Sequence, residues 1–123
     1  MIAAKLDRAK GILHVNPSGP LEEGDFATLA ELADPYLKQK GALAGLMVEI
    51  DRFPGWKNLA GLLGHFRFIR NHHRKIRKVA LVTDARIGKI GERVARHFIA
   101  AKIKRFPASQ AGEARKWLVE KQG

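Results

Sequence analysis

Two large aromatic side chains, Phe53 and Trp56, flank a Pro-Gly turn near the middle of the chain. Loops run over the protein surface and usually carry polar residues. Aromatic rings at this place either fold back onto the core and anchor the loop, or cover the mouth of an apolar pocket. The sequence leaves both interpretations open, and the second makes these two rings candidate ligand-binding residues.

Basic side chains follow this loop in two rows. The first row has helical spacing and consists of Arg67, Arg70 and Arg74. The neighbouring Lys75, Arg77 and Lys78 extend it. The second consists of Lys89, Arg93 and Arg96. At about 100° per residue the first row lies beside an apolar helix face. In that position the stems cover apolar surface while the charged heads reach phosphates. The rows therefore indicate a surface that faces an anion or an anionic membrane, with an ordinary solvated face as the alternative.

The net charge of +11 is concentrated in the second half of the chain. Residues 1–60 hold 7 Lys and Arg against 8 Asp and Glu, whereas residues 61–123 hold 16 against 4, a net charge of +12. Such a field attracts polyanions, which include nucleic acid, anionic lipid and acidic proteins. Composition does not choose among them.

Two carboxylates are candidates for acid–base catalysis. Asp51 and Asp84 each follow a predicted parallel strand, and the carboxyl ends of such strands line the usual ligand crevice of open α/β sheets. They suit an acid–base pair or simple caps of the next loop or helix. The sequence has no cysteine, no nucleophile elbow and no phosphate-binding P-loop. A small hydrolase is therefore the weakest functional hypothesis, and we expect a protein that is not an enzyme and uses no cofactor.

Three histidines, His65, His72 and His73, are the candidate metal ligands in this region. No acidic residue lies between Asp51 and Asp84, so a metal ion here would need ligands from elsewhere. We interpret the histidines as surface or boundary residues and expect no metal site.

Short apolar runs alternate with segments of helical period. The pattern predicts strands at residues 2–6, 11–15, 46–50, 79–82 and 103–106, and helices over residues 21–40, 58–75, 87–102 and 109–121. Crossover helices between strands mean a mostly parallel α/β sheet of four or five strands with an antiparallel start. We expect one domain over residues 1–123, with about four helices mainly on one face. Gly41 and Ser109 are the predicted helix caps, and Pro35 is expected to kink its helix.

The predicted helix over residues 58–75 carries one apolar face, which holds Leu59, Leu62, Leu63, Phe66, Ile69 and His73. We expect an apolar ligand to bind between the sheet and the helices over residues 58–75 and 87–102. The expected lining is Phe53, Trp56, Leu59, Leu63, Phe66, Ile87 and Ile90.

Three segments together resemble the SpoIIAA-like group of the STAS superfamily. They are residues 49–56 (EIDRFPGW), residues 76–84 (IRKVALVTD), and a tail with Arg105-Phe-Pro followed by Trp117-Leu. The sequence departs from the pattern after Asp84, where many relatives carry a tryptophan and this chain has Ile87. The resemblance implies a STAS-like fold in a bacterial protein. It also implies a role as a small carrier or sensor of apolar ligands, with membrane association among the proposed properties.

Anti-anti-sigma factors share the STAS fold and are switched by phosphorylation of a serine or threonine at the start of the helix after the third strand. Residues 51–64 of this chain contain neither. We therefore expect no phosphorylation switch at that site.

The leading hypothesis is a non-enzymatic STAS-like domain that binds an apolar or amphipathic molecule, with its basic rows toward an anionic membrane or the ligand head group. The alternative is a nucleic-acid-binding protein, which the charge favours but for which we find no recognised motif. No apolar run approaches the ~20 residues of a membrane span, and the charged N-terminus is unlike a signal peptide. We expect a cytoplasmic protein, at most peripheral to the membrane.

Overall fold

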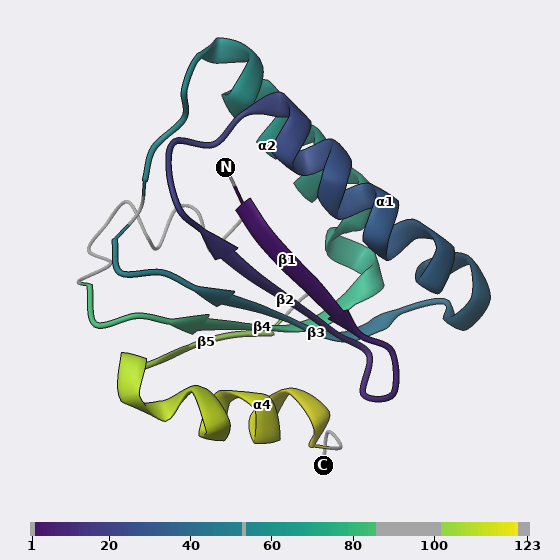
Figure 1. Ribbon diagram of the computed structural model, residues 1–123. Coiled ribbons are helices and arrows are strands. Elements are labelled where there is room, and N and C mark those ends of the chain that lie inside the picture. The colour runs from purple at the N-terminus through teal and green to yellow at the C-terminus, as the bar shows by residue number, and fades with distance from the viewer. Residues whose placement is uncertain (1, 53, 86–101, 121–123) are drawn as a thin grey trace.

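The computed structural model describes residues 2–52, 54–85 and 102–120, which form a five-stranded sheet with helices on both faces (Figure 1). The elements follow in this order: β1 (Ile2–Asp7), β2 (Ile12–Pro17), α1 (Glu23–Lys40), β3 (Leu43–Glu49), α2 (Leu59–His72), the 3-10 helix η1 (His73–Lys75), β4 (Ile76–Val82), β5 (Lys102–Phe106), the 3-10 helix η2 (Ala108–Gln110) and α4 (Ala111–Val119). The helix expected over residues 87–102 lies almost entirely outside the described residues.

The strands lie in the order β1-β2-β3-β4-β5, so that β1 and β5 form the edges. β1 and β2 are antiparallel, and every later pair is parallel. This confirms the mostly parallel mixed sheet predicted from the alternation of strands and helices. β3 and β4 both begin three residues earlier than predicted, because Leu43 pairs with Ile76 in register before the apolar runs start.

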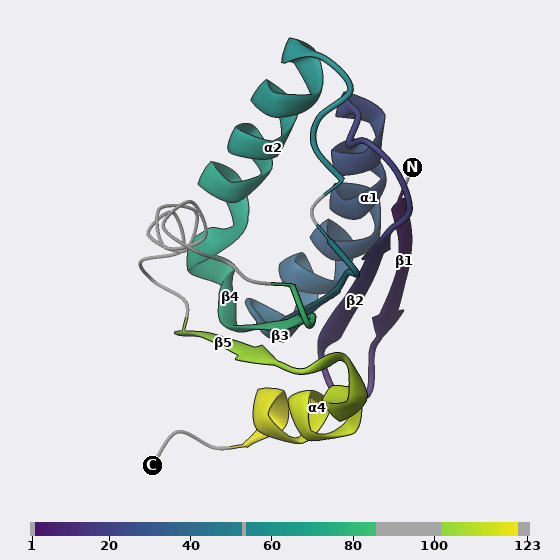
Figure 2. The same ribbon diagram turned by 90° about the vertical axis from the view of Figure 1, so that its left-hand side faces the viewer.

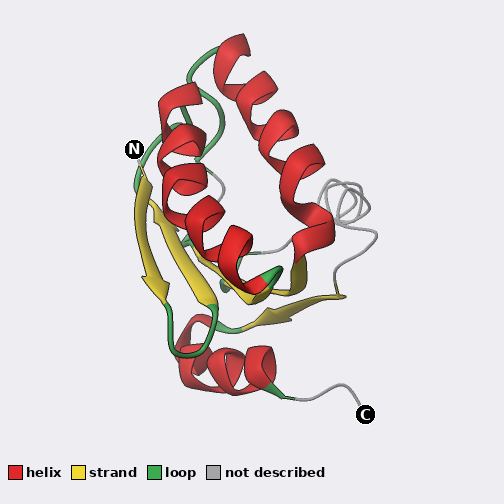
Figure 3. Cartoon of the chain, turned by 90° about the vertical axis from the view of Figure 1, so that its right-hand side faces the viewer, coloured by secondary structure: helices red, strands yellow, loops and turns green. Residues whose placement is uncertain are grey.

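The described helices divide between the two faces of the sheet. α1 and α2 lie side by side on one face, and α4 covers the other (Figures 2 and 3). Successive strand residues point to opposite faces. Leu13 therefore joins the core under α1 and α2 with Phe26 and Phe68, whereas its neighbour Ile12 joins the core under α4 with Leu118.

Local signals fix the ends of α1. The backbone N–H of Glu22 donates to Asp25 Oδ2 at 2.8 Å, which satisfies a donor at the helix start. Gly41 ends the helix as predicted, with φ of 86° and its N–H bonded to Leu37 O at 2.7 Å. A positive φ favours glycine because it has no Cβ. α1 runs as one helix through Pro35.

α2 packs on α1 through small residues. A Cβ at Gly61 would overlap the carbonyl oxygen of Leu21, and one at Gly64 would press on the first turn of α1. Phe68 continues this buried side and packs on Phe26, with ring centroids 6.1 Å apart. The two glycines therefore let the helices approach closely.

The buried side of α2 is not the apolar face that the sequence pattern indicated. Leu59, Leu63 and Phe66 are exposed in the structure, while Ile69 is buried as expected. Periodicity favoured the large apolar residues, but the close contact with α1 requires the side that carries the glycines.

The start of α4 also differs from the prediction. Ser109 lies within η2 and makes no capping hydrogen bond, and neither does Gln110 at the start of α4. Asp84 Oδ1 instead accepts a hydrogen bond of 2.9 Å from the backbone N–H of Ala108. The carboxylate that ends β4 thus holds the turn before α4, which accords with the capping interpretation of Asp84.

Lys78 points under α4 and not toward solvent. Its side chain is 5% exposed, and its Nζ donates to Trp117 O at 2.8 Å and Glu120 O at 2.9 Å. Nζ also lies 5.0 Å from the centre of the Trp117 ring. Lys78 is therefore not part of an anion-facing surface, contrary to the prediction, because it satisfies the carbonyl groups at the end of α4.

None of the helices in the described parts of the chain is both long and apolar enough to cross a membrane.

Candidate functional site

A groove of about 440 Å³ runs along the exposed side of α2. Its lining comes from α2 and the first residue of η1: Leu63, Phe66, Arg67, Ile69, Arg70 and His73. We call it the α2 groove. Residues three or four apart on a helix are neighbours on its surface, so one helix supplies both an apolar and a basic wall.

The apolar wall remains open to solvent. Leu63 is 51% exposed and Phe66 is 45% exposed, while Ile69 is buried at the base. Leu59, one turn before Leu63, extends the same exposed row toward the start of α2. Contiguous large apolar side chains on a surface commonly mark a site of interaction.

The basic wall carries two exposed guanidinium groups, those of Arg67 and Arg70. Neither forms an ion pair within residues 2–52, 54–85 and 102–120, where the salt bridges involve other groups. No carboxylate occurs anywhere between Asp51 and Asp84 to compete for them. The groove thus has positive charge available for an anion.

His73 closes the end of the groove with a buried polar atom. Its Nδ1 is shielded from solvent and has no hydrogen-bond partner among the described residues. Buried polar atoms in folded proteins nearly always have a partner, so such an atom needs an explanation.

His72 lies on the opposite side of α2 and is fully engaged. It is 7% exposed, with Nε2 at 2.7 Å from Asp34 Oδ1 on α1 and Nδ1 at 2.8 Å from Phe68 O. Both oxygens are acceptors, so a ring nitrogen that carries a proton donates to the oxygen beside it. The ring also stacks on Phe68 at 4.2 Å. His72 therefore ties α2 to α1, and its prediction as a surface or boundary residue was wrong.

The loop before α2 is held by its backbone. Leu21 N donates to Gly55 O at 2.8 Å, and Lys57 N donates to Leu21 O at 2.9 Å. Lys57 also forms an ion pair of 2.7 Å with Glu22, whose hydrogen bond and negative charge raise the pKa of the lysine. These bonds tie the loop to the start of α1.

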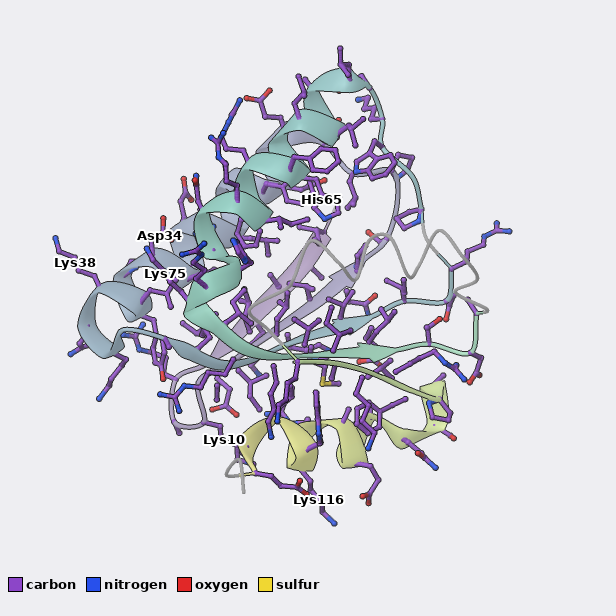
Figure 4. The ribbon with its side chains drawn as sticks, turned by 180° about the vertical axis from the view of Figure 1, so that it is seen from behind. Lys10, Asp34, Lys38, His65, Lys75 and Lys116 are labelled. Atoms are coloured by element: carbon purple, nitrogen blue, oxygen red, sulfur yellow. The ribbon has the colours of Figure 1, made fainter. Side chains whose placement is uncertain are left out.

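The side chain of Trp56 lies against His65. Trp56 Nε1 donates to His65 Nδ1 at 3.1 Å, and the His65 ring stacks on Phe26 at 4.9 Å (Figure 4 labels His65). The indole is nevertheless 38% exposed. Trp56 is thus anchored on one side and open to solvent on the other.

The structure brings four of the predicted site residues into the groove: Leu63, Phe66, Arg67 and Arg70. Leu59 and Trp56 lie outside its lining toward the start of α2, and Arg74, Lys75 and Arg77 are exposed beyond its other end. Predictions for Phe53, Ile87, Ile90, Lys89, Arg93 and Arg96 fall outside the described residues. His73 was not predicted as a site residue, although its spacing of three from Arg70 was a usable signal.

The structure adds little to a catalytic interpretation. Asp51 and Asp84 are both exposed, and Asp84 is engaged with the Ala108 backbone. Within the described residues no three metal-ligating side chains gather into one cluster.

Comparison with known proteins identifies the family and the fold. The SpoIIAA-like family model matches residues 12–119. The chain belongs to the SpoIIAA-like family. A crystal structure of an uncharacterized protein of the DUF3478 family from Shewanella loihica PV-4, with a SpoIIAA-like fold, matches with a TM-score of 0.73 and 21% identity over 95% of this chain and 93% of that one. A search of curated proteins finds no match.

Membership of the SpoIIAA-like family confirms the STAS-like fold, and it directs attention to the start of the helix after β3. Here the N-cap of α2 is Asn58, whose side chain accepts a hydrogen bond of 2.9 Å from Gly61 N. The residue that caps this helix is therefore an asparagine and not a serine or threonine.

Proposed function

We propose that this SpoIIAA-like protein is a non-enzymatic carrier or sensor that binds an amphipathic, lipid-like anion in the α2 groove. One observation carries the proposal. The exposed side chains of Leu63 and Phe66 line the same groove as the guanidinium groups of Arg67 and Arg70, which form no ion pair with any described residue. An apolar chain with an anionic head group matches both walls at once.

The dimensions of the groove support this class of ligand. Its volume of about 440 Å³ lies within the range of roughly 300–1,000 Å³ typical of small-molecule sites. Removing apolar surface from water contributes about 25 cal/mol per Å². An alkyl chain laid along Leu63 and Phe66 therefore gains binding energy that a purely polar ligand lacks.

Further exposed basic residues support the proposal that the ligand enters or leaves the groove at an anionic membrane. Arg74, Lys75 and Arg77 follow the groove residues in the sequence and are exposed. We expect binding to vesicles of anionic lipid that weakens with salt, because exposed charges are screened within about 10 Å at 0.1 M. Tighter binding to nucleic acid than to these vesicles at ~0.15 M salt would favour the nucleic-acid alternative.

A matched pair of variants tests the ligand site. Dodecanoate should bind the delipidated protein saturably in calorimetry. Leu63→Ser should weaken this binding about tenfold or more, because burying a leucine side chain is worth about 1.5–3 kcal/mol. Val119→Ser changes an exposed apolar residue on α4, across the sheet, and should leave binding unchanged.

Equal affinity in the wild type, Leu63→Ser and Val119→Ser would contradict the assignment of the groove. The absence of any binding by alkyl carboxylates or alkyl phosphates of this or greater chain length would contradict the carrier function itself.

A further inference from the structure

Three nitrogen-bearing side chains recur every third residue along the polar wall of the α2 groove. Arg67, Arg70 and His73 all line it. The two guanidinium groups have no carboxylate partner in the described parts of the chain, and His73 Nδ1 is buried without a partner there. Among the described residues, the polar end of the groove thus has hydrogen-bonding capacity that is not used.

The charge and the number of oxygens differ between anionic head groups. A carboxylate has two oxygens, which one guanidinium can satisfy in a bidentate pair. A phosphate monoester has three terminal oxygens and carries about −1.5 to −2 charges at pH 7. Two guanidinium groups beside an imidazole therefore favour the phosphate monoester, which carries more negative charge and one more terminal oxygen than a carboxylate.

The direction of α2 makes positively charged side chains necessary if an anion is to bind at this end of the groove. Arg70 and His73 lie at its C-terminal end, where the helix dipole is negative and disfavours an anion. An anion held here depends on the side chains, because the helix backbone does not help.

We propose that the α2 groove selects alkyl phosphate monoesters, with the phosphate between Arg67, Arg70 and His73 and the alkyl chain along Phe66 and Leu63 toward Leu59. This inference rests on the proposed function and narrows its ligand class.

Three probes test the head group and the chain separately. They are dodecyl phosphate, dodecanoate and inorganic phosphate, each titrated calorimetrically into delipidated protein at one ionic strength. We expect dodecyl phosphate to bind at least tenfold more tightly than dodecanoate, and inorganic phosphate to bind far more weakly than either. A charge-assisted hydrogen bond is worth enough to change affinity about tenfold.

Variants locate the phosphate. Arg70→Gln and His73→Gln should each weaken dodecyl phosphate about tenfold and dodecanoate much less, so that the preference shrinks. The control is Lys116→Gln, which removes the same charge from α4 on the far side of the sheet (Figure 4). It should leave both affinities unchanged. Arg67→Gln provides a second arginine variant, and melting midpoints verify that each variant is folded.

The outcomes separate the two proposals. Dodecanoate binding as tightly as dodecyl phosphate, or variants that weaken both probes equally, would overturn the phosphate preference while leaving the carrier function standing. Inorganic phosphate binding as tightly as dodecyl phosphate would support the phosphate site and overturn the role of the apolar wall. Binding by none of the three would overturn both proposals.

Discussion

On the side of α2 that faces α1, the two ring nitrogens of His72 meet Asp34 and the Phe68 carbonyl at 2.7 and 2.8 Å. One residue later and on the other side, His73 leaves Nδ1 buried with no partner in the described part of the chain. The same contrast separates Phe68, which is 8% exposed, from Phe66, which is 45% exposed. Groups on the inner side are buried against α1, whereas Phe66 is exposed and His73 Nδ1 has no hydrogen-bond partner among the described residues.

This difference indicates where α2 contributes stability and where it contributes function. Natural sequences depart from local consistency mainly at functional sites, and compensate elsewhere. The inner side, with its glycine contacts and its His72–Asp34 pair, holds the helix in place. The groove side can then keep apolar surface and positive charge exposed.

The two phenylalanines should separate these roles most strongly. Phe68→Ala should destabilise the protein by about 3–5 kcal/mol, the usual cost of truncating a buried aromatic ring. Phe66→Ala should cost less than about 1 kcal/mol but weaken dodecanoate binding. Denaturant unfolding measures the first effect and calorimetry the second. Similar destabilisation by both substitutions would remove the contrast between the two sides of α2.

The glycine contact can be tested against a helix glycine that has open space. Gly61→Ala should destabilise the protein by about 1–3 kcal/mol, because the new methyl group would overlap the Leu21 carbonyl oxygen. Gly112→Ala in α4 meets nothing within 4 Å and should stabilise by up to about 1 kcal/mol. Thermal melts of the two variants should therefore shift in opposite directions. A stabilised Gly61→Ala would mean that α1 and α2 do not approach as closely as described.

Two lysines extend the comparison to the other face of the sheet. Lys78→Met should cost about 1–3 kcal/mol, because it leaves the carbonyls of Trp117 and Glu120 without their donor. Lys116→Met on the solvent side of α4 should change stability by no more than about 0.5 kcal/mol. Neither substitution should affect ligand binding in the α2 groove. A loss of vesicle binding in Lys78→Met without loss of stability would restore Lys78 to the anion-facing surface.

Local sequence signals predicted the sheet and much of the groove. The mostly parallel sheet with its antiparallel start followed from the alternating periods, the end of α1 from Gly41, and four residues of the groove from the helical spacing of apolar and basic side chains. The missed features depend on contacts between distant segments. His72 contacts Asp34, which lies 38 residues away in the sequence. Lys78 donates to the end of α4, 39 and 42 residues away. No periodicity within one helix reveals such partners.

The prediction of which side of α2 is buried was wrong for the same reason. Hydrophobic periodicity gives weight to large side chains, so it could not count Gly61 and Gly64 as contacts. The need for glycine at these two positions is seen only in the folded structure, where Leu21 and the first turn of α1 lie against them.

The most direct test of a ligand site on the groove side of α2 is a titration of isotope-labelled protein with dodecanoate, followed by the backbone amide signals. We predict saturable shifts that centre on Leu63, Phe66, Arg70 and His73, while the amides of α4 stay unchanged. Shifts that centre on α4, or none at saturating ligand, would contradict the account.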